Sequence, residues 1–434
     1  MSLLKNNRLI VLALLMTVMV ISALDKTIFA FAGVQIIDEL ELSPEQFGFV
    51  GSSFFFLYSI SGVLVGFLAN RIATRWILVA MAIVWMVAQA LVTFSDGLAL
   101  LVVSRLLLGA GTGPATAVTL HACFKWFRPE ERVLPSSLIY SSMMFGVLVG
   151  ALSLPFAIEQ LGWRMAYLCL AIAGFIWLGL WLMLGGEGRY GSDSNGPIAD
   201  DSVRLPYKAL LLNRTFVCVI LLGFLCYVPT ALGFSWTVVY LKKGLNLESQ
   251  QAGYFMLGIT VLTMMGGLAV STLSQRAMKR GGSAFCTMIL PPFVCSLLGG
   301  LMFLGIGFAH GDTLLILALL FAGTALVNVL PSFSMAITAH FVPSGQRGSM
   351  LAINNAFQTS AGMVAPYLVG SLVAWKGNEV AQGFELAITG FGAATILCAL
   401  IGGCLADPES TRKRLSLVAG QGSETSTLHA NAIA

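Results

Sequence analysis

The chain has 434 residues, of which 57% are hydrophobic and only 10% are charged. A soluble domain usually carries about 25% charged residues, so this composition excludes an ordinary soluble fold and predicts a chain that is solvated by lipid. The eight cysteines lie in or beside apolar runs and none forms a CxxC pair, which argues against a disulfide framework or a metal site. The formal net charge of +4 is small, so the distribution of the charges is more informative than their sum.

A membrane-crossing helix needs about 20 mostly apolar residues. Twelve stretches of the chain meet this requirement, at 9–34, 46–67, 76–95, 98–121, 134–156, 165–185, 215–240, 252–273, 284–308, 313–340, 349–374 and 383–405. The first stretch begins like a signal peptide, with Lys5 and Arg8 before an apolar run. That run is too long and has no small-residue cleavage site, so we expect it to be the first membrane span.

One long polar connection divides these spans into two sets of six. The sequence therefore predicts an N-terminal six-helix bundle at 1–185, a cytoplasmic linker at 186–214, a C-terminal six-helix bundle at 215–406 and a disordered cytoplasmic tail at 407–434. The halves also repeat each other, because Arg71 and Arg75 after the second span have the same spacing as Arg276 and Arg280 after the eighth. Parallel repeats of this kind are related by a pseudo-two-fold axis and hold a binding site between them, near the membrane midplane.

The basic residues orient the bundle, because Lys and Arg are retained on the cytoplasmic side of a membrane. With both termini inside, 18 of the 24 basic residues fall on the cytoplasmic side, and only Lys26 and Arg105 lie within spans. We therefore expect a multi-pass protein of the cell inner (plasma) membrane with both termini in the cytoplasm.

Several motifs now point to a family. The segment 66–75, which reads GFLANRIATR, resembles the loop G-x-L-A-D-R-x-G-x-R of the major facilitator superfamily, and 105–111 matches the R-x-x-x-G-x-G of its fourth helix. Gly162-Trp163-Arg164 before the sixth span is also typical of it. The resemblance covers the whole chain and implies an all-α membrane protein with twelve transmembrane helices in two six-helix bundles. It also implies a gating loop formed by Asn70, Arg71 and Arg75.

Within that superfamily, the chain is most similar to the anion:cation symporters, which carry sugar acids, aromatic acids and other organic anions. The likeness lies in Asp25-Lys26 of the first span, the SFFFLY run that ends at Tyr58, the WTVVYL run that begins at Trp236, and Asn355, which stands eleven residues before Pro366. The resemblance implies that Tyr58, Trp236 and Asn355 belong to the substrate site.

The chain departs from the family pattern at several positions. Asn70 replaces the loop Asp and Ala73 replaces its Gly, so the loop brings no carboxylate to a neighbouring helix terminus. Thr112 stands where many of these symporters have a second carboxylate in the fourth helix. The coupling therefore stays open between one-proton symport, sodium coupling, exchange and uncoupled transport.

Only three charged residues lie clearly inside a span, away from its ends, where a charge costs about 2.5–3.5 kcal/mol even on a lenient scale. Asp25 is roughly 24 Å into the first span and Arg105 is roughly 10 Å into the oppositely directed fourth span, at 1.5 Å per residue. In a core about 30 Å thick, Asp25, Lys26 and Arg105 can therefore form one cluster. In the functional interpretation, Lys26 and Arg105 bind a substrate carboxylate and Asp25 is the proton-coupling residue. In the structural alternative, Asp25 merely neutralises Lys26 or Arg105.

Uncharged polar residues in spans are weaker candidates. Tyr58, Trp236, Asn355 and Gln358 are predicted to contact the substrate, and Asn355 and Gln358 are three residues apart on one helix. The alternative is ordinary hydrogen bonding between helices, which contributes only about 0.6 kcal/mol on average in membranes.

The predicted function is secondary active transport of a small organic anion, such as a sugar acid or an aromatic acid, by proton symport with alternating access. The alternative on the same fold is efflux of drugs or metabolites. No cluster of catalytic His, Asp or Cys appears near an interface, so we expect no enzyme. The expected partners are the organic anion, protons and membrane lipids, with no nucleic acid, cofactor or metal, and the protein is expected to act as a monomer.

Overall fold

The structure is a computed structural model, and it describes residues 2–68, 72–128, 131–188, 205–309, 311–411 and 413–415. Within these ranges the chain forms helices joined by short connections, and it forms no strand. The prediction of an all-helical protein is confirmed.

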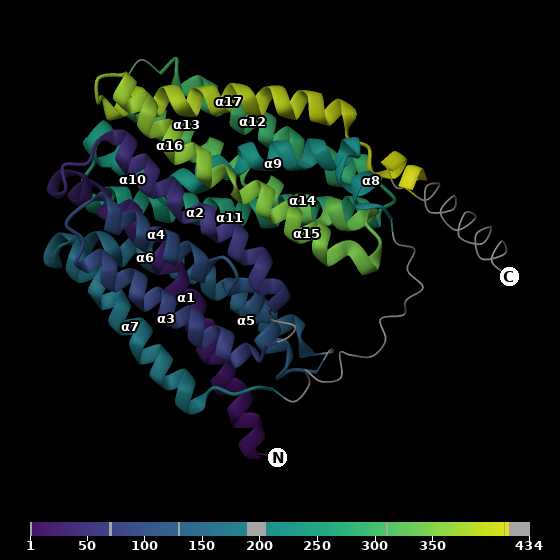
Figure 1. Ribbon diagram of the computed structural model, residues 1–434. Coiled ribbons are helices and arrows are strands. Elements are labelled where there is room, and N and C mark those ends of the chain that lie inside the picture. Colours follow the sequence, from purple (N-terminus) through teal and green to yellow (C-terminus); the bar gives the residue numbers. More distant parts are fainter. Residues whose placement is uncertain are drawn as a thin grey trace, which may run out of the picture. The chain divides into compact units, whose positions relative to one another are not determined.

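The described part of the first half of the chain forms seven α-helices, which Figure 1 labels in chain order. They are α1 (Ser2–Glu39), α2 (Pro44–Leu68), α3 (Thr74–Thr93), α4 (Leu98–Thr112), α5 (Ala115–Phe124), α6 (Val133–Leu161) and α7 (Trp163–Leu184). A single residue, Gly162, joins α6 to α7 with a backbone φ of 77°. Glycine adopts this left-handed conformation without the steric penalty that a Cβ would bring.

The second half begins with a short helix, which is followed by longer helices and two π-helical segments. Its elements are α8 (Tyr207–Leu211), α9 (Arg214–Gly233), α10 (Trp236–Val239), the π-helical η4 (Tyr240–Gly244), α11 (Ser249–Lys279), the π-helical η5 (Phe285–Ile289), α12 (Leu290–Ile306), α13 (Thr313–Val327), α14 (Leu330–Phe341), α15 (Ser344–Thr359), α16 (Ala361–Trp375) and α17 (Val380–Leu405). The short α8 lies within the predicted linker, 186–214.

The helices match the predicted spans. Eleven helical segments of the described chain are long and apolar enough to cross a membrane. The remaining predicted span, 349–374, is present as α15 and α16, which a turn at Ser360 separates into two helices of 16 and 15 residues. This interruption, and not a missing span, explains why each piece is shorter than a membrane helix.

Three other spans are interrupted. Gly113 and Pro114 separate α4 from α5, Phe234 and Ser235 separate α9 from α10, and Asn328 and Val329 separate α13 from α14. Proline supplies no N–H to the helical ladder, which accounts for the break at Pro114. Together with the break at Ser360, the interrupted spans are the fourth, seventh, tenth and eleventh of the predicted set.

The chain divides into two compact units. Unit 1 comprises Met1–Gly196, Pro229–Val261 and Thr359–Ala387, and unit 2 comprises Pro197–Val228, Leu262–Gln358 and Ile388–Ala434. The boundaries fall inside α9, α11 and α17, so the units are not the halves that the sequence predicts. The two six-helix bundles therefore stay a prediction.

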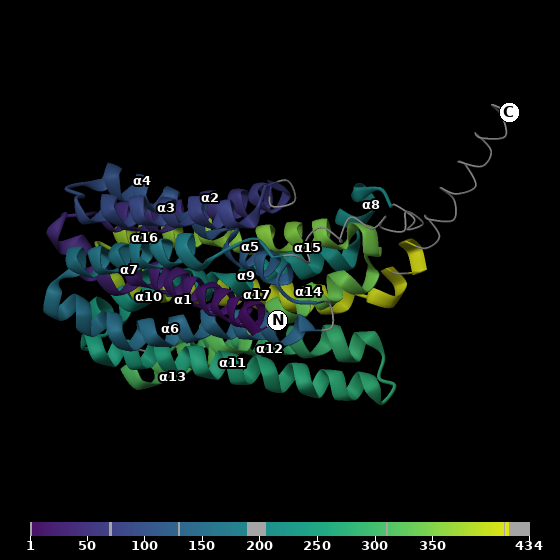
Figure 2. The same ribbon diagram turned by 90° about the horizontal axis from the view of Figure 1, so that it is seen from below.

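Unit 1 contains the helices that carry the buried charges. In it, α1 packs on α5, α6, α7 and α10, and α3 packs on α4, α5 and α7 (Figure 1). The second helix, α2, packs on α4 and also on α16 (Figure 2). The contact with α16 is close, because a Cβ on Gly48 would meet the carbonyl of Pro366 and a Cβ on Gly370 would meet that of Pro44. Segments more than 300 residues apart in the sequence thus form one interface.

Unit 2 is built around α12. This helix packs on α13 and α14, and the glycines Gly300 and Gly392 bring its backbone next to that of α17. In the tail, residues 407–411 and 413–415 are described; 408–411 and 413–415 are helical, and Leu415 is buried. The rest of the predicted tail, most of the predicted linker (189–204) and the loop residues Asn70 and Arg71 lie outside the described residues.

Candidate functional site

Three charged side chains are buried in unit 1. Asp25 and Lys26 on α1 are 1% and 9% exposed, and Arg105 on α4 is 1% exposed. In the part of the chain that the structure describes, no other Asp, Glu, Lys or Arg is buried. Both Lys26 and Arg105 act electrostatically on Asp25, so the structure brings together the three charges that the sequence singles out.

Two aromatic rings hold the Arg105 guanidinium. Its Cζ lies 4.3 Å from the ring centre of Phe29 on α1 and 4.8 Å from that of Phe54 on α2. A planar guanidinium stacks well on aromatic faces, which attract its positive charge. One turn along α4, Gly109 lets this helix approach the backbone of α2 at Phe54, and this close packing sets the position of Arg105.

Two hydrogen-bond donors of the Arg105 guanidinium have no acceptor among the described residues. They are Nε and Nη1, and both are inaccessible to solvent. A buried donor without a partner costs about 1–3 kcal/mol, and more when it is charged. The two rings stabilise the charge but accept no conventional hydrogen bond from these N–H groups, so the site is chemically suited to an anionic ligand.

Lys26 lies beside the same aromatic group. Its Nζ is 5.4 Å from the ring centre of Tyr58, and the Tyr58 ring is itself 5.4 Å from that of Phe54. Lys26, Tyr58 and Arg105, which were all predicted to bind substrate, therefore share one cluster of α1, α2 and α4. Tyr58 is half-buried.

The Asp25 carboxylate has a partner that the sequence analysis missed. Gln89 on α3 donates a hydrogen bond from Nε2 to Oδ1 of Asp25. Among the described residues, no ion pair joins Asp25 to Lys26 or Arg105, and Arg105 has free donors. The structural alternative, a self-contained ion pair, is therefore not what the geometry presents. Gln89 is the only amide of the predicted span 76–95, which is the signal that could have identified it.

Trp236 is buried but its N–H is already used. Its Nε1 donates a 2.9 Å hydrogen bond to the carbonyl of Pro366, so only its ring is available for further contacts. That ring lies edge-on against Phe47, at 5.0 Å between centres, and Phe47 stacks on Phe29 at 4.9 Å. The aromatic series from Trp236 through Phe47 and Phe29 thus ends at the Arg105 guanidinium.

The two remaining predicted substrate residues lie in unit 2 and differ from each other. Gln358 is buried and donates to Asn354 and, at 2.8 Å, to the Ser334 hydroxyl. Asn354 in turn donates to the Ser334 carbonyl and the Thr338 hydroxyl. Asn355 is exposed. Residues four apart share a helix face, so the buried polar face of α15 contains Asn354 and Gln358 and leaves Asn355 to one side.

Of the predicted gating residues, Arg75 is described, and it lies in a polar cluster at the start of α3. The Glu187 carboxylate, just beyond α7, accepts from the Thr74 and Arg75 N–H groups at 3.2 and 3.0 Å and pairs with Lys125. Burial raises the pKa of Glu187, but hydrogen bonds from Lys125, Arg75 and Thr74 lower it more, so this pKa lies below its ordinary value. Glu187 is therefore a carboxylate that neutralises the positive end of α3, and the sequence analysis missed it.

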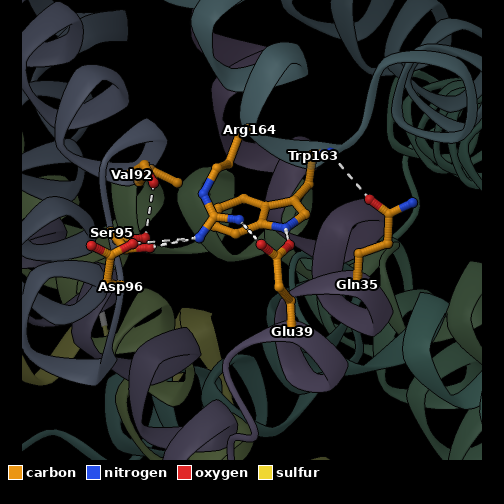
Figure 3. A network of polar contacts seen from close by, with 7 residues as sticks. All are labelled: Gln35, Glu39, Val92, Ser95, Asp96, Trp163 and Arg164. Atoms are coloured by element: carbon orange, nitrogen blue, oxygen red, sulfur yellow. Dashed lines mark hydrogen bonds and ion pairs between the residues drawn. The ribbon is translucent and has the colours of Figure 1, made fainter.

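A second polar network joins the end of α1 to the start of α7 (Figure 3). It lies at the end of unit 1 opposite to the Glu187 cluster, and we call this end the distal end. Glu39 accepts from the Trp163 indole and pairs with Arg164. Arg164 also donates to the Ser95 carbonyl at 3.0 Å, and the Trp163 N–H donates to Gln35 at 3.1 Å. These contacts tie α1, α7 and the α3–α4 connection together.

With the geometry established, comparison with known proteins identifies the family. Residues 15–293 match the Major Facilitator Superfamily. This is more than half of the chain, and the chain belongs to this superfamily. The predicted family is confirmed, and the protein is a multi-pass membrane protein of a transporter class.

Individual relatives extend over nearly the full length. The chain is 27% identical over 418 residues to a probable sulfoacetate transporter, SauU, of Cupriavidus necator. The aligned region covers 90% of this chain and 94% of that protein. It is 25% identical over 392 residues to the hexuronate transporter of Bacillus subtilis, with coverages of 86% and 90%. It is 22% identical to a D-galactonate transporter of Escherichia coli, with coverages of 90% and 95%. These relatives agree with the resemblance to the anion:cation symporters.

Solved structures confirm the fold. A bacterial homologue of the human lysosomal transporter Spinster, in an inward-facing and unoccupied conformation, matches 95% of this chain and 98% of its own with a TM-score of 0.78 and 15% identity. The D-xylose–proton symporter matches 93% and 99% with a TM-score of 0.70 and 16% identity. At these identities the likeness extends to the major facilitator fold and not to the substrate.

Proposed function

We propose that this protein transports a small organic anion, a carboxylate such as a sugar acid or an aromatic acid, across the membrane. The observation that carries this proposal is Arg105, whose Nε and Nη1 are buried between two aromatic rings without an acceptor among the described residues. A carboxylate accepts two parallel hydrogen bonds from a guanidinium, so an anion would satisfy these donors. Sulfoacetate, hexuronate and D-galactonate, the compounds in the names of three relatives, are all organic anions.

The charge balance of the cluster supports an anionic substrate. With Asp25 ionised, the buried charges are one acid and two bases, Lys26 and Arg105, which leaves one positive charge in excess. Uncompensated charge is costly inside a membrane protein. A monoanionic substrate beside Lys26 and Arg105 would remove this excess, and a lipophilic cation would increase it.

Proton symport is the coupling that we propose, with Asp25 as the proton-coupling residue. Asp25 is the only buried acid among the described residues. It accepts its hydrogen bond from a neutral amide rather than from a cation, so its proton can be exchanged without breaking an ion pair. Substrate bound between Lys26 and Arg105 would change the charge that faces Asp25 and thereby couple the two occupancies.

Alternating access is the proposed mechanism, with the halves 1–185 and 215–406 moving against each other. In unit 1, parts of both halves meet at the distal end. The Tyr367 N–H donates to the Ser52 hydroxyl at 3.1 Å, and Lys243 pairs with Asp38. In this proposal such contacts close one end of the transport path and break when that end opens. The loop with Asn70, Arg71 and Arg75 is proposed to gate the opposite end.

The proposal includes the membrane and the other substrate contacts. We infer that the protein lies in the cell inner membrane as a monomer in contact with lipid, with both termini in the cytoplasm, because most basic residues then face the cytoplasm. Tyr58, Trp236, Asn355 and Gln358 are proposed to contact the parts of the substrate beyond its carboxylate. For Trp236 this contact would be apolar, because its N–H is already bonded.

The first test is a thermal-shift screen of the purified protein with sugar acids, aromatic acids, dicarboxylates and lipophilic cations, since a ligand that binds only the folded form raises the melting temperature. We expect one class of carboxylates to raise it, and Lys26→Ala and Arg105→Ala to abolish the shift and the uptake of the same compound into proteoliposomes. Arg164→Ala, an arginine outside the cluster, is the control. Anion uptake that survives both cluster variants would refute the site, and stabilisation by lipophilic cations alone would favour efflux.

A further inference from the structure

We propose that Gln89 is a positioning residue for Asp25, whose amide supports this carboxyl in both its ionised and its protonated form and so sets the pH range of coupling. The inference rests on the proposed function, in which Asp25 carries the coupled proton. It assigns a role to a residue of α3, a helix that supplies none of the predicted substrate or coupling residues.

The geometry fixes Gln89 against Asp25. Gln89 is 2% exposed, and its Nε2 donates to Oδ1 of Asp25. Trp85, Ala88 and Val92, on the turns around it, are also buried. Its backbone carbonyl accepts a 3.1 Å hydrogen bond from the Thr93 hydroxyl. A rigid helical position therefore presents the amide to the carboxylate.

The hydrogen bond from Gln89 differs in kind from the other interactions of Asp25, which act through charge at a distance. The charged and titratable groups that act on Asp25 among the described residues are Lys26 on its own helix, Arg105 from α4 and Tyr167 from α7. The Tyr167 hydroxyl makes no hydrogen bond within the described chain. Three further helices pack on α1, namely α5, α6 and α10. The short α10 carries no titratable side chain. The titratable side chains of α5 and α6 are not among the groups that act on Asp25; they are His121, Cys123, Tyr140 and Glu159.

The chemistry of an amide suits a carboxyl that changes its charge. An ionised carboxylate only accepts hydrogen bonds, whereas a protonated carboxyl also donates one. The glutamine side chain offers two N–H donors and a carbonyl acceptor. Its Nε2 donates to ionised Asp25, and a half-turn of the terminal amide places its Oε1 to accept from protonated Asp25. A buried group without a hydrogen bond is costly, and Gln89 avoids this cost in both states.

The alternatives at this position would favour one state. A Lys or Arg bonded to Asp25 would hold it ionised, because separating a buried ion pair is strongly unfavourable. An apolar residue would offer no hydrogen bond to either form. The neutral amide leaves the charge balance of Asp25 to Lys26, Arg105 and the substrate, which is what coupling to substrate requires.

The test compares Gln89→Met, which keeps the length but neither donor nor acceptor, with Asp25→Asn and with the control Thr93→Val on the same helix. Reconstituted protein is titrated by infrared difference spectroscopy, which detects the C=O band of a protonated carboxyl without any substrate. Uptake of glucuronate, sulfoacetate and D-galactonate is measured against pH in proteoliposomes.

We expect the band that Asp25→Asn removes to titrate in Gln89→Met with a midpoint displaced by about one pH unit or more, toward higher pH. Both forms of Asp25 lose a hydrogen bond in this variant, but the bond to the ionised carboxylate is the stronger of the two. The pH profile of gradient-driven uptake should move with it, while Thr93→Val matches the parent protein. If Gln89→Met does not fold, Gln89→Glu keeps the size and adds a second carboxyl, and we expect it to displace and broaden the same titration.

Two negative outcomes are distinguishable. If Asp25→Asn removes the band and the pH dependence of uptake but the Gln89 variants titrate like the parent, then Gln89 has only a structural role and the inference fails. If Asp25→Asn leaves the pH dependence of uptake unchanged, then Asp25 does not carry the coupled proton, and the coupling part of the proposed function fails.

Discussion

Two arginines of unit 1, Arg105 and Arg164, have opposite surroundings. Arg164 pairs with Glu39, donates to the Ser95 carbonyl and lies 4.2 Å from the ring centre of Trp163 (Figure 3). Arg105 lies between two rings and has two N–H donors without an acceptor in the described chain. The arginine with access to water has its partners within the protein, and the buried one has none for these donors.

In the proposed function, this difference separates a structural role for Arg164 from a substrate-binding role for Arg105. A partly exposed ion pair contributes about 0–1 kcal/mol, so the Arg164 network joins helix ends at little cost if it is lost. A buried cation without an anionic partner persists only where something else selects for it. We therefore expect substitutions around Arg105 to act on transport and substitutions around Arg164 to act weakly on stability.

The largest effect is expected for Arg105→Lys, which keeps the charge but removes the planar group. A lysine ammonium has neither the fork of N–H donors that matches a carboxylate nor a planar surface for both rings. Since hydrogen bonds to charged groups contribute about 1.5–3 kcal/mol, anion affinity should fall roughly 10- to 150-fold, as measured by thermal shift or by the KM of uptake. Arg164→Lys should change affinity by less than about twofold. Equal losses in both variants would break the distinction between the two arginines.

A smaller effect is expected for Gly109→Ala, which acts on the support of Arg105. A Cβ at this position would meet the Phe54 carbonyl, and because that atom belongs to the backbone, α4 would have to move away from α2. We expect a lower melting temperature and weaker anion binding. Gly179→Ala in α7, where nothing lies near the new atom, should match the parent protein or be slightly more stable. A fully active and stable Gly109→Ala would show that the α2–α4 contact does not position Arg105.

The sequence predicts the fold well because span length and charge are local properties. Each apolar stretch identifies a membrane helix by itself, and the interruption at Ser360 changes its shape but not its existence. The depths of Asp25 and Arg105 in oppositely directed helices also follow from counting residues. These features need no knowledge of which helices touch.

The details of the site depend on which face of a helix meets which neighbour, and here the sequence is less informative. Gln89 stands in an apolar helix whose partner is not specified by any pattern. In α15 the family resemblance selects Asn355, whereas the buried face contains Asn354 and Gln358. Glu187 lies in a polar segment, and nothing in that segment indicates that it neutralises the start of α3.

The third prediction concerns that carboxylate. The pKa of Glu187 is lower in the folded protein than its ordinary value of 4.5. Its charge therefore stabilises the fold fully above that ordinary value. This contribution is lost as the pH falls through the lower pKa of the folded state. Glu187→Gln should therefore destabilise the protein by about 1 kcal/mol at pH 7, the usual contribution of a helix cap. Melting curves at pH 7 and pH 4 should show the difference shrinking in acid. A difference that is the same at both pH values would contradict this assignment.

The smallest effect is expected for Glu39→Gln in the distal network. The variant removes the charge that pairs with Arg164 but keeps an oxygen for the Trp163 indole, and both partners of the pair are partly exposed. We expect a loss of about 0.2–1 kcal/mol that diminishes between 50 mM and 500 mM salt, because exposed charges are screened, and uptake within about twofold of the parent. A large loss of uptake with unchanged stability would place Arg164 in the transport cycle. Both arginines would then have a role in transport, and they would differ only in what that role is.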